Sequence, residues 1–148
     1  MSELVSVITA SYNAEKYIAE TIKSVQAQTH QNWELLITDD ASTDNTCNII
    51  EEFTQIDDRI QLFRLKENSG PAKARNRSIK MAKGKFIAFL DADDLWLPEK
   101  LETQVKTLLD NESYVCFSTY LIIDESGKPL KKIVQALPNL SFDKLLKN

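Results

Sequence analysis

The chain has 148 residues, of which 43% are hydrophobic and 27% are charged, and its net charge is −4. This length and balance are typical of one soluble globular domain with a real core, so we expect residues 1–148 to form a single domain. The acidic balance gives no reason to expect a nucleic-acid partner, and no basic run suggests a membrane patch. No apolar stretch approaches the roughly 20 residues that span a bilayer, and we expect no cleaved leader. A cytoplasmic protein is therefore expected.

The cysteine, glycine and histidine content excludes several kinds of site. Cys47 and Cys116 are too few and too far apart for a disulfide framework or a zinc cluster, so we expect reduced thiols in the core. The chain has three glycines, Gly70, Gly84 and Gly127. Their spacing excludes both the Walker-A loop and the Rossmann fingerprint. The one histidine, His30, lies in a polar stretch that does not resemble a nucleophile elbow, and we expect it in a surface loop.

Four strand-like segments alternate with helical patterns through the first two thirds of the chain. The strands are expected at residues 4–8, 33–38, 60–65 and 86–90. The helices are expected at 14–28 with Asn13 as N-cap, from 42–44 to about 56, at 71–83 and from Pro98. This alternation predicts an α/β fold with three α/β/α layers, Rossmann-like, around a mainly parallel sheet in the core order 3-2-1-4.

The last third of the chain predicts a hairpin. A strand is expected at residues 114–123, a tight turn at 125–128 and a second strand at 130–135. Residues 141–148 have the pattern of the opening of a helix.

Residues 86–96 combine a continuous apolar run with three carboxylates. A short apolar run of this kind predicts a strand that is buried on both faces. If the backbone stays extended, Asp91 and Asp93 point to the same side, with their Cα atoms about 7 Å apart. Two ionised carboxylates held together need a cation, and Mg²⁺ or Mn²⁺ binds through such groups together with substrate phosphates. The alternative is a solvated acidic loop that caps the helix starting near Pro98.

Ligands of doubly wound sheets bind beyond the carboxyl ends of the strands, where the strand order reverses. In the order 3-2-1-4 that edge carries residues 10–13 and Asp91–Asp94, with Asp39 and Asp40 one strand away. We expect the Asp40 carboxylate to accept the imide N–H of a uracil ring and Tyr12 to stack on the base. The alternative is that Asp39 or Asp40 caps the following helix, and the role of Asp39 stays open.

The third helix opens with three cationic residues. Lys73 and Arg77 share one face at i and i+4 and are expected to be solvated. Arg75 lies nearer the apolar stripe, and an arginine turned toward the sheet near a helix N-terminus either meets a diphosphate or pairs with an aspartate. Trp96, near the acidic loop, either supports a sugar by apolar contact or packs against the core.

Five blocks of sequence occur in an order that is more specific than any one of them: residues 5–13, 24–29, 34–44, 74–76 and 91–94. Together they resemble the family 2 glycosyltransferases of GT-A fold. The resemblance implies a nucleotide-sugar site made of Ala10, Tyr12, Asp40, Arg75, Asp91, Ala92 and Asp93. Ala10, Tyr12 and Asp40 would line the uridine pocket. Asp91 and Asp93 would meet the ribose, the diphosphate and a Mg²⁺ or Mn²⁺ ion. Ala10 stands where many relatives have another residue, often proline, which changes the pocket wall and not the chemistry.

The resemblance also implies the reaction: an inverting transfer from a UDP-sugar donor to a saccharide or glycolipid acceptor. Polysaccharide or glycolipid assembly would bring the full-length protein to the cytoplasmic face of the membrane as a peripheral protein. The family's general base comes from a second, acceptor-binding half, and we do not assign Asp124 or Glu125, in or beside a hairpin turn, to that role. We therefore expect residues 1–148 to be an N-terminal, donor-binding portion that stops before the acceptor half.

Two rival functions stay open at this point. A nucleotide-binding module without turnover would bind UDP or a UDP-sugar and transfer nothing. A phosphate-accepting receiver domain also gathers aspartates on a parallel sheet, but its acidic pair follows the first strand, which here ends in residues 11–13. The lysine that such a domain carries after its last strand is also absent at a matching place, so we disfavour it.

Overall fold

The computed structural model describes residues 2–124 and 126–136. Contacts between residues divide the chain into two compact units, Met1–Lys106 and Thr107–Asn148. The helix α4 (Lys100–Asp110) crosses the boundary between them. Whether the chain behaves as one domain, as its length predicts, stays a prediction. Within the described ranges no helix has both the length and the apolar character needed to cross a bilayer.

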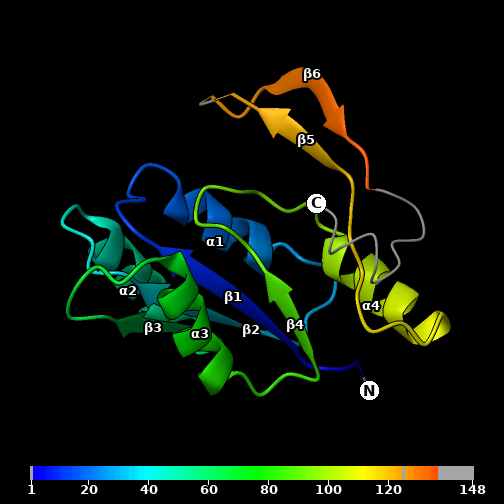
Figure 1. Cartoon of the computed structure of the whole chain (residues 1–148), viewed down its shortest axis with the longest axis horizontal. Coiled ribbons are helices and arrows are strands. Elements are labelled where there is room, and N and C mark those ends of the chain that lie inside the picture. The colour runs from blue at the N-terminus through cyan, green and yellow to red at the C-terminus, as the bar shows by residue number, and fades with distance from the viewer. Residues whose placement is uncertain (1, 125, 137–148) are drawn as a thin grey trace. The chain divides into compact units, whose positions relative to one another are not determined.

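The first unit is a parallel sheet whose strands alternate with helices (Figure 1). The strands are β1 (Val5–Ser11), β2 (Trp33–Asp39), β3 (Ile60–Arg64) and β4 (Phe86–Phe89). The helices between them are α1 (Ile18–Gln26), α2 (Thr46–Ile56) and α3 (Pro71–Met81). The strand order is β3-β2-β1-β4, and every pairing is parallel. The predicted α/β class and the core order 3-2-1-4 are confirmed.

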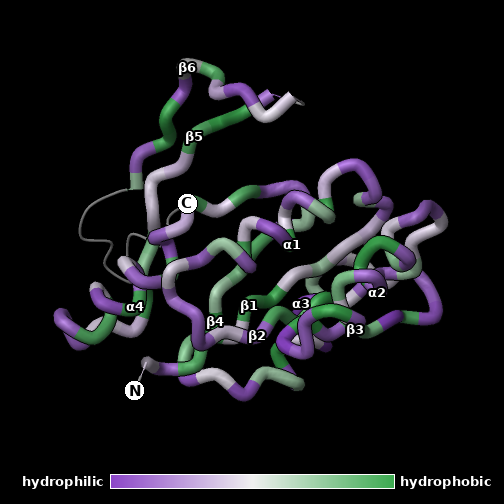
Figure 2. The backbone as a smooth tube through the Cα atoms, turned by 180° about the vertical axis from the view of Figure 1, so that it is seen from behind, coloured by the Kyte–Doolittle hydropathy of each residue, from purple (hydrophilic) through white to green (hydrophobic). Residues whose placement is uncertain are grey.

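The apolar core lies between the sheet and the helices α1 and α2. Val7 of β1 and Leu35 of β2 are paired in register, and both are almost completely buried. They belong to one apolar cluster with Ile22 of α1 and Ile50 of α2. Burial of one stripe of each helix is the arrangement that its spacing of apolar residues predicted. Figure 2 shows that hydrophilic and hydrophobic residues also alternate along α3 and α4.

Helix α3 covers the opposite face of the sheet. The hydroxyl oxygens of Thr38 in β2 and Ser78 in α3 are 2.7 Å apart, and both residues are fully buried. Because successive side chains of a strand point to opposite faces, Thr38 lies on the side away from the core residue Ile37. The three α/β/α layers are therefore present as predicted.

A buried polar network joins the segment before β4 to the sheet. The carboxylate Oε1 of Glu34 accepts hydrogen bonds from the Ser6 hydroxyl (2.6 Å) and from the backbone N–H of Lys83 (2.7 Å). The Ser6 hydroxyl oxygen in turn accepts the backbone N–H of Gly84 at 2.8 Å. A Cβ atom on Gly84 would lie 2.6 Å from the backbone nitrogen of Ser6. The close approach of the two backbones at this point therefore requires glycine.

β4 has one exposed face, so the prediction of a strand buried on both faces is wrong. Within the described residues β1 is its only partner strand, and it ends at Phe89. Ile87 and Phe89 on one face are 45% and 57% exposed, while Phe86 and Ala88 on the other are half-buried. An apolar run predicts that a strand forms, but it does not say which neighbours cover it.

The second unit contains an antiparallel hairpin of β5 (Tyr120–Ile123) and β6 (Pro129–Val134). The backbone N–H of Asp124 donates to the carbonyl of Lys128 at 2.9 Å, and Gly127 takes a φ of 76° in the turn. The predicted hairpin is confirmed.

The strand that was predicted for residues 114–123 forms only from Tyr120 onward. Residues 114–119 have the composition of a strand, but within the described residues they pair with no other strand. Strand propensity depends on a partner surface, so the prediction is wrong for this segment. The helix predicted at 141–148 lies outside the described residues.

Three side chains are buried to a different extent than the sequence predicted: His30, Cys47 and Cys116. His30 is buried, with 9% of its surface exposed, and its Nε2 lies 2.8 Å from the carbonyl oxygen of Glu3, so its prediction as a surface residue is wrong. The polar neighbours of His30 gave no sign of this contact. Cys47 and Cys116 are free thiols, as predicted, but both are half-buried and neither belongs to the core.

Candidate functional site

The carboxyl ends of β1, β2 and β4 meet at one edge of the sheet in the first unit. The backbone N–H of Asp40, just after β2, donates to the carbonyl of Ser11 in β1 at 2.8 Å. The N–H of Leu90, just after β4, donates to the carbonyl of Ile8 at 3.1 Å. Hydrogen bonding to β1 therefore continues one residue past the end of β2 and of β4. It places Tyr12, Asp40 and the acidic segment that follows Leu90 on a common edge, as the strand order predicted.

Asp40 anchors the loop that leads into α3. Its side chain is 3% exposed, and its two oxygens accept the backbone N–H groups of Ser69 (2.7 Å) and Gly70 (2.8 Å). Gly70 has a φ of 89°, a left-handed conformation that glycine adopts without strain. Each carboxylate oxygen can accept more than one hydrogen bond, so these contacts leave Asp40 able to bind a further donor.

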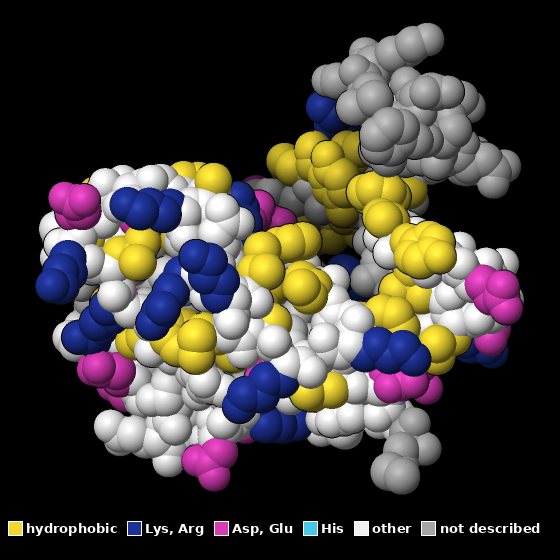
Figure 3. Space-filling view, turned by 60° about the horizontal axis from the view of Figure 1, so that its bottom comes forward, with side chains coloured by type: hydrophobic (Ala, Val, Ile, Leu, Met, Phe, Trp, Pro, Cys, Tyr) yellow, Lys and Arg dark blue, Asp and Glu magenta, His cyan; other side chains and the backbone are white. Residues whose placement is uncertain are grey.

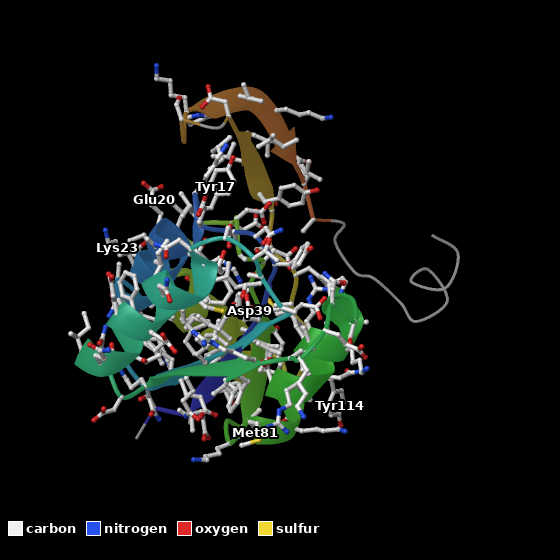
Figure 4. All side chains as sticks on the ribbon, turned by 90° about the vertical axis from the view of Figure 1, so that its left-hand side faces the viewer. Tyr17, Glu20, Lys23, Asp39, Met81 and Tyr114 are labelled. Carbon is white, nitrogen blue, oxygen red and sulfur yellow. The ribbon has the colours of Figure 1, made fainter. Side chains whose placement is uncertain are left out.

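Asp39 caps the loop that follows β2, which decides the role that its sequence left open. It is 1% exposed and lies inside the first unit (Figure 4). Its carboxylate accepts the backbone N–H of Ser42 at 2.8 Å, the Ser42 hydroxyl, and the Ser11 hydroxyl at 3.0 Å. Because Ser11 immediately precedes Tyr12, Asp39 ties the end of β1 to the end of β2.

Tyr12 begins a loop whose conformation is held by hydrogen bonds of the next residue, Asn13. Asn13 takes a φ of 48°, and its side-chain oxygen accepts the backbone N–H of Thr43 at 2.9 Å. The backbone N–H of Asn13 donates to the Ser42 hydroxyl oxygen at 2.9 Å. Since α1 begins only at Ile18, the prediction of Asn13 as its N-cap is wrong. Tyr12 is 50% exposed at the base of this loop.

The same pair of loops is linked again further out. The backbone N–H of Glu15 donates to the Asp44 carboxylate at 3.1 Å, and the N–H of Asn45 donates to the Glu15 carboxylate at 3.0 Å. Partial desolvation raises the pKa of Asp44, but hydrogen bonds from Thr46 and Glu15 outweigh it, and the pKa lies below its usual range. The edge that carries Tyr12 is therefore rigidly built.

The residues after β4 turn instead of continuing as a strand. The backbone N–H of Asp94 donates to the carbonyl of Asp91 at 3.2 Å, so the extended backbone assumed for Asp91 and Asp93 is not present. The hydroxyl of Thr21 in α1 donates to the carbonyls of Ala92 and Asp94, both at 3.0 Å. Ala92 is 8% exposed and belongs to the apolar cluster, so its packing against the core holds the turn in place.

The turn concentrates negative charge. The pKa of Asp94 is raised above its usual range, mainly by desolvation and to a smaller extent by the charges of Asp93 and Asp91. Arg75 of α3 offsets part of this charge, because its Nη2 lies 2.5 Å from Oδ1 of Asp91. Of the two partners considered for Arg75, the structure shows the aspartate. Within the described residues no ion pair involves Asp93, and its side chain is exposed.

A hollow of about 380 Å³ is lined by Arg75, Phe89, Asp91 and Asp94. Phe89 was not among the predicted site residues. Its place in a continuous apolar run indicated burial, and no feature of the sequence distinguishes it from the buried Leu90 beside it. An exposed aromatic ring beside carboxylates is suited to the apolar face of a sugar.

The turn does not cap the following helix. Near the start of α4, the N–H of Leu101 donates to the side-chain oxygen of Gln28 at 3.0 Å. Within the described hydrogen bonds, no carboxylate from Asp91 to Asp94 accepts an N–H of this helix. Trp96 is half-buried against the core cluster, with Lys100 4.3 Å from its ring centroid, which agrees with the packing alternative for this residue.

The carboxylates of the turn have the right chemistry for a divalent cation. No group of three His, Cys, Asp or Glu side chains is gathered as a metal site in the part of the chain that the structure describes. Mg²⁺ and Mn²⁺ do not need such a cage when phosphates complete their coordination, and one or two carboxylates suffice. Asp93 and Asp91 are the residues whose oxygens would hold such an ion, and their charges add to the desolvation that raises the pKa of Asp94.

The chain is an α/β protein with a parallel sheet in the order 3-2-1-4 and carboxylates at its carboxyl edge, and the solved structures similar to it are glycosyltransferases of GT-A fold. The chain belongs to glycosyl transferase family 2, whose family model matches residues 6–146. It is 45% identical over 145 residues to the putative teichuronic acid biosynthesis glycosyltransferase TuaG of Bacillus subtilis, covering 98% of this chain and 58% of that protein. It is also 45% identical over 145 residues to an Escherichia coli protein, the UDP-Glc:alpha-D-GlcNAc-diphosphoundecaprenol beta-1,3-glucosyltransferase WfgD, covering 98% of this chain and 56% of that protein.

Solved structures agree with this assignment. S. aureus TarS 1-349 in complex with UDP is similar with a TM-score of 0.68 and 35% identity, over 73% of this chain and 32% of that chain. The mannosyltransferase PcManGT from Pyrobaculum calidifontis, in complex with GDP-Man and Mn²⁺, is similar with a TM-score of 0.67 and 29% identity, over 73% of this chain and 33% of that chain. The family is therefore one of enzymes, and the chain spans a little over half the length of the two curated relatives named above.

Proposed function

We propose that residues 1–148 bind a UDP-sugar and that the protein transfers its sugar, with inversion, to a saccharide or glycolipid acceptor. The UDP complex of TarS and the UDP-Glc in the name of WfgD support a uridine donor. The diphosphoundecaprenol in the same name supports a lipid-linked acceptor. Such an acceptor lies in a membrane, and we propose peripheral action at its cytoplasmic face.

One observation carries this proposal. Tyr12, Asp40 and the Asp91–Asp94 turn come from three different strand ends, and the sheet brings them to one edge. A nucleoside diphosphate has an aromatic base at one end and a pyrophosphate at the other. The aromatic ring of Tyr12 and the buried acceptor Asp40 match the base. The acidic turn, which would bind a cation, matches the pyrophosphate.

At the base end, Asp40 is the proposed partner of the uracil imide N–H. Its carboxylate is fixed by Ser69 and Gly70, so its remaining acceptor positions are oriented before the nucleotide arrives. Guanine also presents N–H groups, but a purine ring is larger. Ala10 on β1 and Tyr12 in the loop after β1 would bound the pocket, and we expect them to favour the smaller pyrimidine.

At the diphosphate end, Arg75 and the aspartates of the turn are the proposed contacts. Arg75 is one-third exposed, so its guanidinium can reach phosphate oxygens while it stays beside Asp91. Asp93 and Asp91 are the residues that would hold Mg²⁺ or Mn²⁺, and the bound ion would neutralise charge on the leaving diphosphate. The main-chain anchor from Thr21 keeps the turn in place for both contacts.

Calorimetric titration with UDP, with and without Mn²⁺, tests the proposal. We expect UDP to bind in both conditions and to bind at least about tenfold more tightly with Mn²⁺, a difference of about 1.4 kcal/mol. GDP should bind more weakly than UDP under the same conditions. Negligible heat from a folded sample with UDP in both conditions would overturn the proposal.

A second candidate is a nucleotide-binding module without turnover. It is favoured by the state of Asp124, whose carboxylate accepts the Ser126 and Lys128 N–H groups and the Ser126 hydroxyl in the β5–β6 turn. These hydrogen bonds, with that of the Ser126 side chain foremost, lower the pKa of Asp124, which suits a turn residue and not a general base. Sugar transfer by the longer protein to a diphospholipid acceptor would exclude this candidate. UDP binding without transfer or hydrolysis would favour it.

A further inference from the structure

Helix α3 and the residues that follow it are strongly basic in an otherwise acidic chain. Residues 71–85 contain six Lys and Arg residues and no Asp or Glu, whereas the net charge of the whole chain is −4. Figure 3 shows Lys and Arg side chains gathered on the left half of the face in view, with Asp and Glu mainly at its margin. A local excess of this size needs a physical explanation, because like charges on one helix face repel.

Four of these cations form what we call the basic face: Lys73, Arg77, Lys80 and Lys83. All four are exposed. Lys73, Arg77 and Lys80 follow one another at i, i+4 and i+7, so they lie along one side of α3. Within the described residues none of the four forms an ion pair. Their recorded side-chain contacts are neutral: Lys73 donates to the Ser69 hydroxyl oxygen at 3.2 Å, and Arg77 lies 5.5 Å from the ring centroid of Phe63.

The other cations of residues 71–85 are used within the protein. Arg75 is paired with Asp91 at the candidate site, and Lys85 is paired with Glu3 at 2.6 Å. The basic face therefore differs from its neighbours because its cationic groups form no ion pair with a carboxylate in the described structure. Met81, at the end of α3, is 37% exposed and adds an apolar side chain beside it.

We propose that the basic face docks on an anionic phospholipid bilayer. The proposal rests on the function proposed above, in which the acceptor is carried by a membrane lipid, as the name of WfgD indicates for that relative. The phosphates of an anionic bilayer are complementary to a row of unpaired cations, and each Lys or Arg near such a surface contributes measurably to binding. Helix α3 also follows its N-cap residue Gly70, which Asp40 holds, so docking along α3 would keep the donor site close to the lipid surface.

Vesicle sedimentation of the chain tests this proposal. We expect binding to vesicles of phosphatidylglycerol and phosphatidylcholine, little binding to pure phosphatidylcholine, and loss of binding in high salt. The double variant Arg77→Glu with Lys80→Glu should bind the anionic vesicles at least about 30-fold more weakly, since two favourable contacts are lost. Neither residue belongs to the candidate nucleotide site, so UDP binding should be unchanged.

A matched control separates the basic face from net charge. The double variant Lys23→Glu with Lys106→Glu reverses two exposed lysines of α1 and α4. Each reversal changes the charge by two units, so both double variants carry a net charge of −8. The control should keep most of the vesicle binding of the parent chain. Equal loss in both variants would mean that net charge decides, and it would overturn the proposal.

Other outcomes also decide the question. Binding to single-stranded RNA without binding to anionic vesicles would overturn it, as would equal binding to neutral vesicles. If the Glu variant does not fold, Arg77→Gln with Lys80→Gln removes the same cations without adding acids and should show the same loss. UDP titration of each variant reports on the donor site separately. Vesicle binding without UDP binding would therefore contradict the proposed function and leave the docking surface supported.

Discussion

Asp39 and Asp40 are neighbours in the chain with different partners. Asp40 holds the backbone of Ser69 and Gly70, whereas Asp39 holds Ser11 and Ser42. Asp39 therefore holds the loops after β1 and β2, whereas Asp40 holds the loop before α3 and is the one of the two that we propose as a ligand contact. In this scheme Asp39 touches no ligand, and its role is to position Asp40, which does.

Substitution of Asp39 tests this positioning role. Asp39→Ala leaves buried hydroxyl and N–H donors unpaired, and we expect it to lower the free energy of unfolding by about 1–3 kcal/mol. Asp39→Asn should restore most of the stability, because the amide oxygen can accept the Ser42 N–H and the serine hydroxyls can accept from the amide. Urea unfolding measures both variants. An alanine variant as stable as the parent would show that these contacts do not hold the loops.

Asp93 is predicted to couple nucleotide binding to the metal. Asp93→Asn removes a charged oxygen ligand, so we expect the Mn²⁺-dependent gain in UDP affinity to fall by about tenfold, with metal-free UDP affinity nearly unchanged. Calorimetric titration measures both quantities. Asp58→Asn, at another exposed aspartate just before β3, is the control and should behave as the parent chain. A full metal effect in the Asp93 variant would contradict the assignment.

The site could be predicted from sequence as far as strand ends determine it. The strand order brought Tyr12, Asp40 and Asp91 to one edge, as expected. Contacts between distant loops could not be predicted, because pairs such as Arg75 with Asp91 depend on side-chain direction. For the same reason the role of Phe89 was not recognised. The ligand contacts of these residues stay predictions.

At the scale of elements, the approach of β4 to β1 depends on Gly84. Gly84→Ala would place a methyl group 2.6 Å from the Ser6 nitrogen and 2.9 Å from the Leu4 carbonyl oxygen, both backbone atoms. We expect a loss of about 1–3 kcal/mol in the free energy of unfolding, because the backbone must shift. Thermal or urea unfolding measures it. Lys83→Ala, at the neighbouring exposed position, should change stability by less than about 0.5 kcal/mol. Equal stability of both variants would contradict the close packing.

The link between α2 and β3 should make stability depend on pH. Hydrogen bonding from Arg59 is the main cause that lowers the pKa of Asp57 to about 2. Partial desolvation raises this pKa, and a hydrogen bond from Gln26 lowers it further. Because the folded pKa is depressed, the contribution is present above about pH 4 and is lost as the pH falls toward 2.

Asp57→Asn tests this dependence. At pH 7 we expect the variant to be less stable than the parent by about 2 kcal/mol, and the difference should shrink below pH 4. Urea unfolding at several pH values measures it. A difference that stays constant from pH 7 to pH 3 would show that the charge of Asp57 contributes nothing.

Helices with a clear apolar stripe were predicted well, whereas the burial of β4 and the start of the strand β5 were not. Ile22 of α1 and Ile50 of α2 lie in the core because their spacing leaves only one apolar face. β4 and residues 114–119 have strand-like composition, but their burial depends on neighbours that composition does not reveal.

At the scale of the whole molecule, the chain combines a net charge of −4 with a basic face on α3 and an acidic turn after β4. The acidic turn and the basic helix meet at Arg75, where cation and carboxylate are already paired. A dianionic nucleotide can therefore enter an acidic chain without meeting uniform repulsion, because cations border its site. This division of charge distinguishes the donor edge from the proposed lipid-facing surface.

The central claim is that one ligand joins Asp40 and Asp93 across the edge of the sheet. Crystals of the chain with UDP and Mn²⁺, measured for anomalous scattering of manganese, test it most directly. We predict a manganese peak at about 2.2 Å from an Asp93 oxygen and a uracil imide N–H within hydrogen-bonding distance of Asp40. A manganese peak away from the Asp91–Asp94 turn, or a uracil ring away from Tyr12 and Asp40, would contradict the claim.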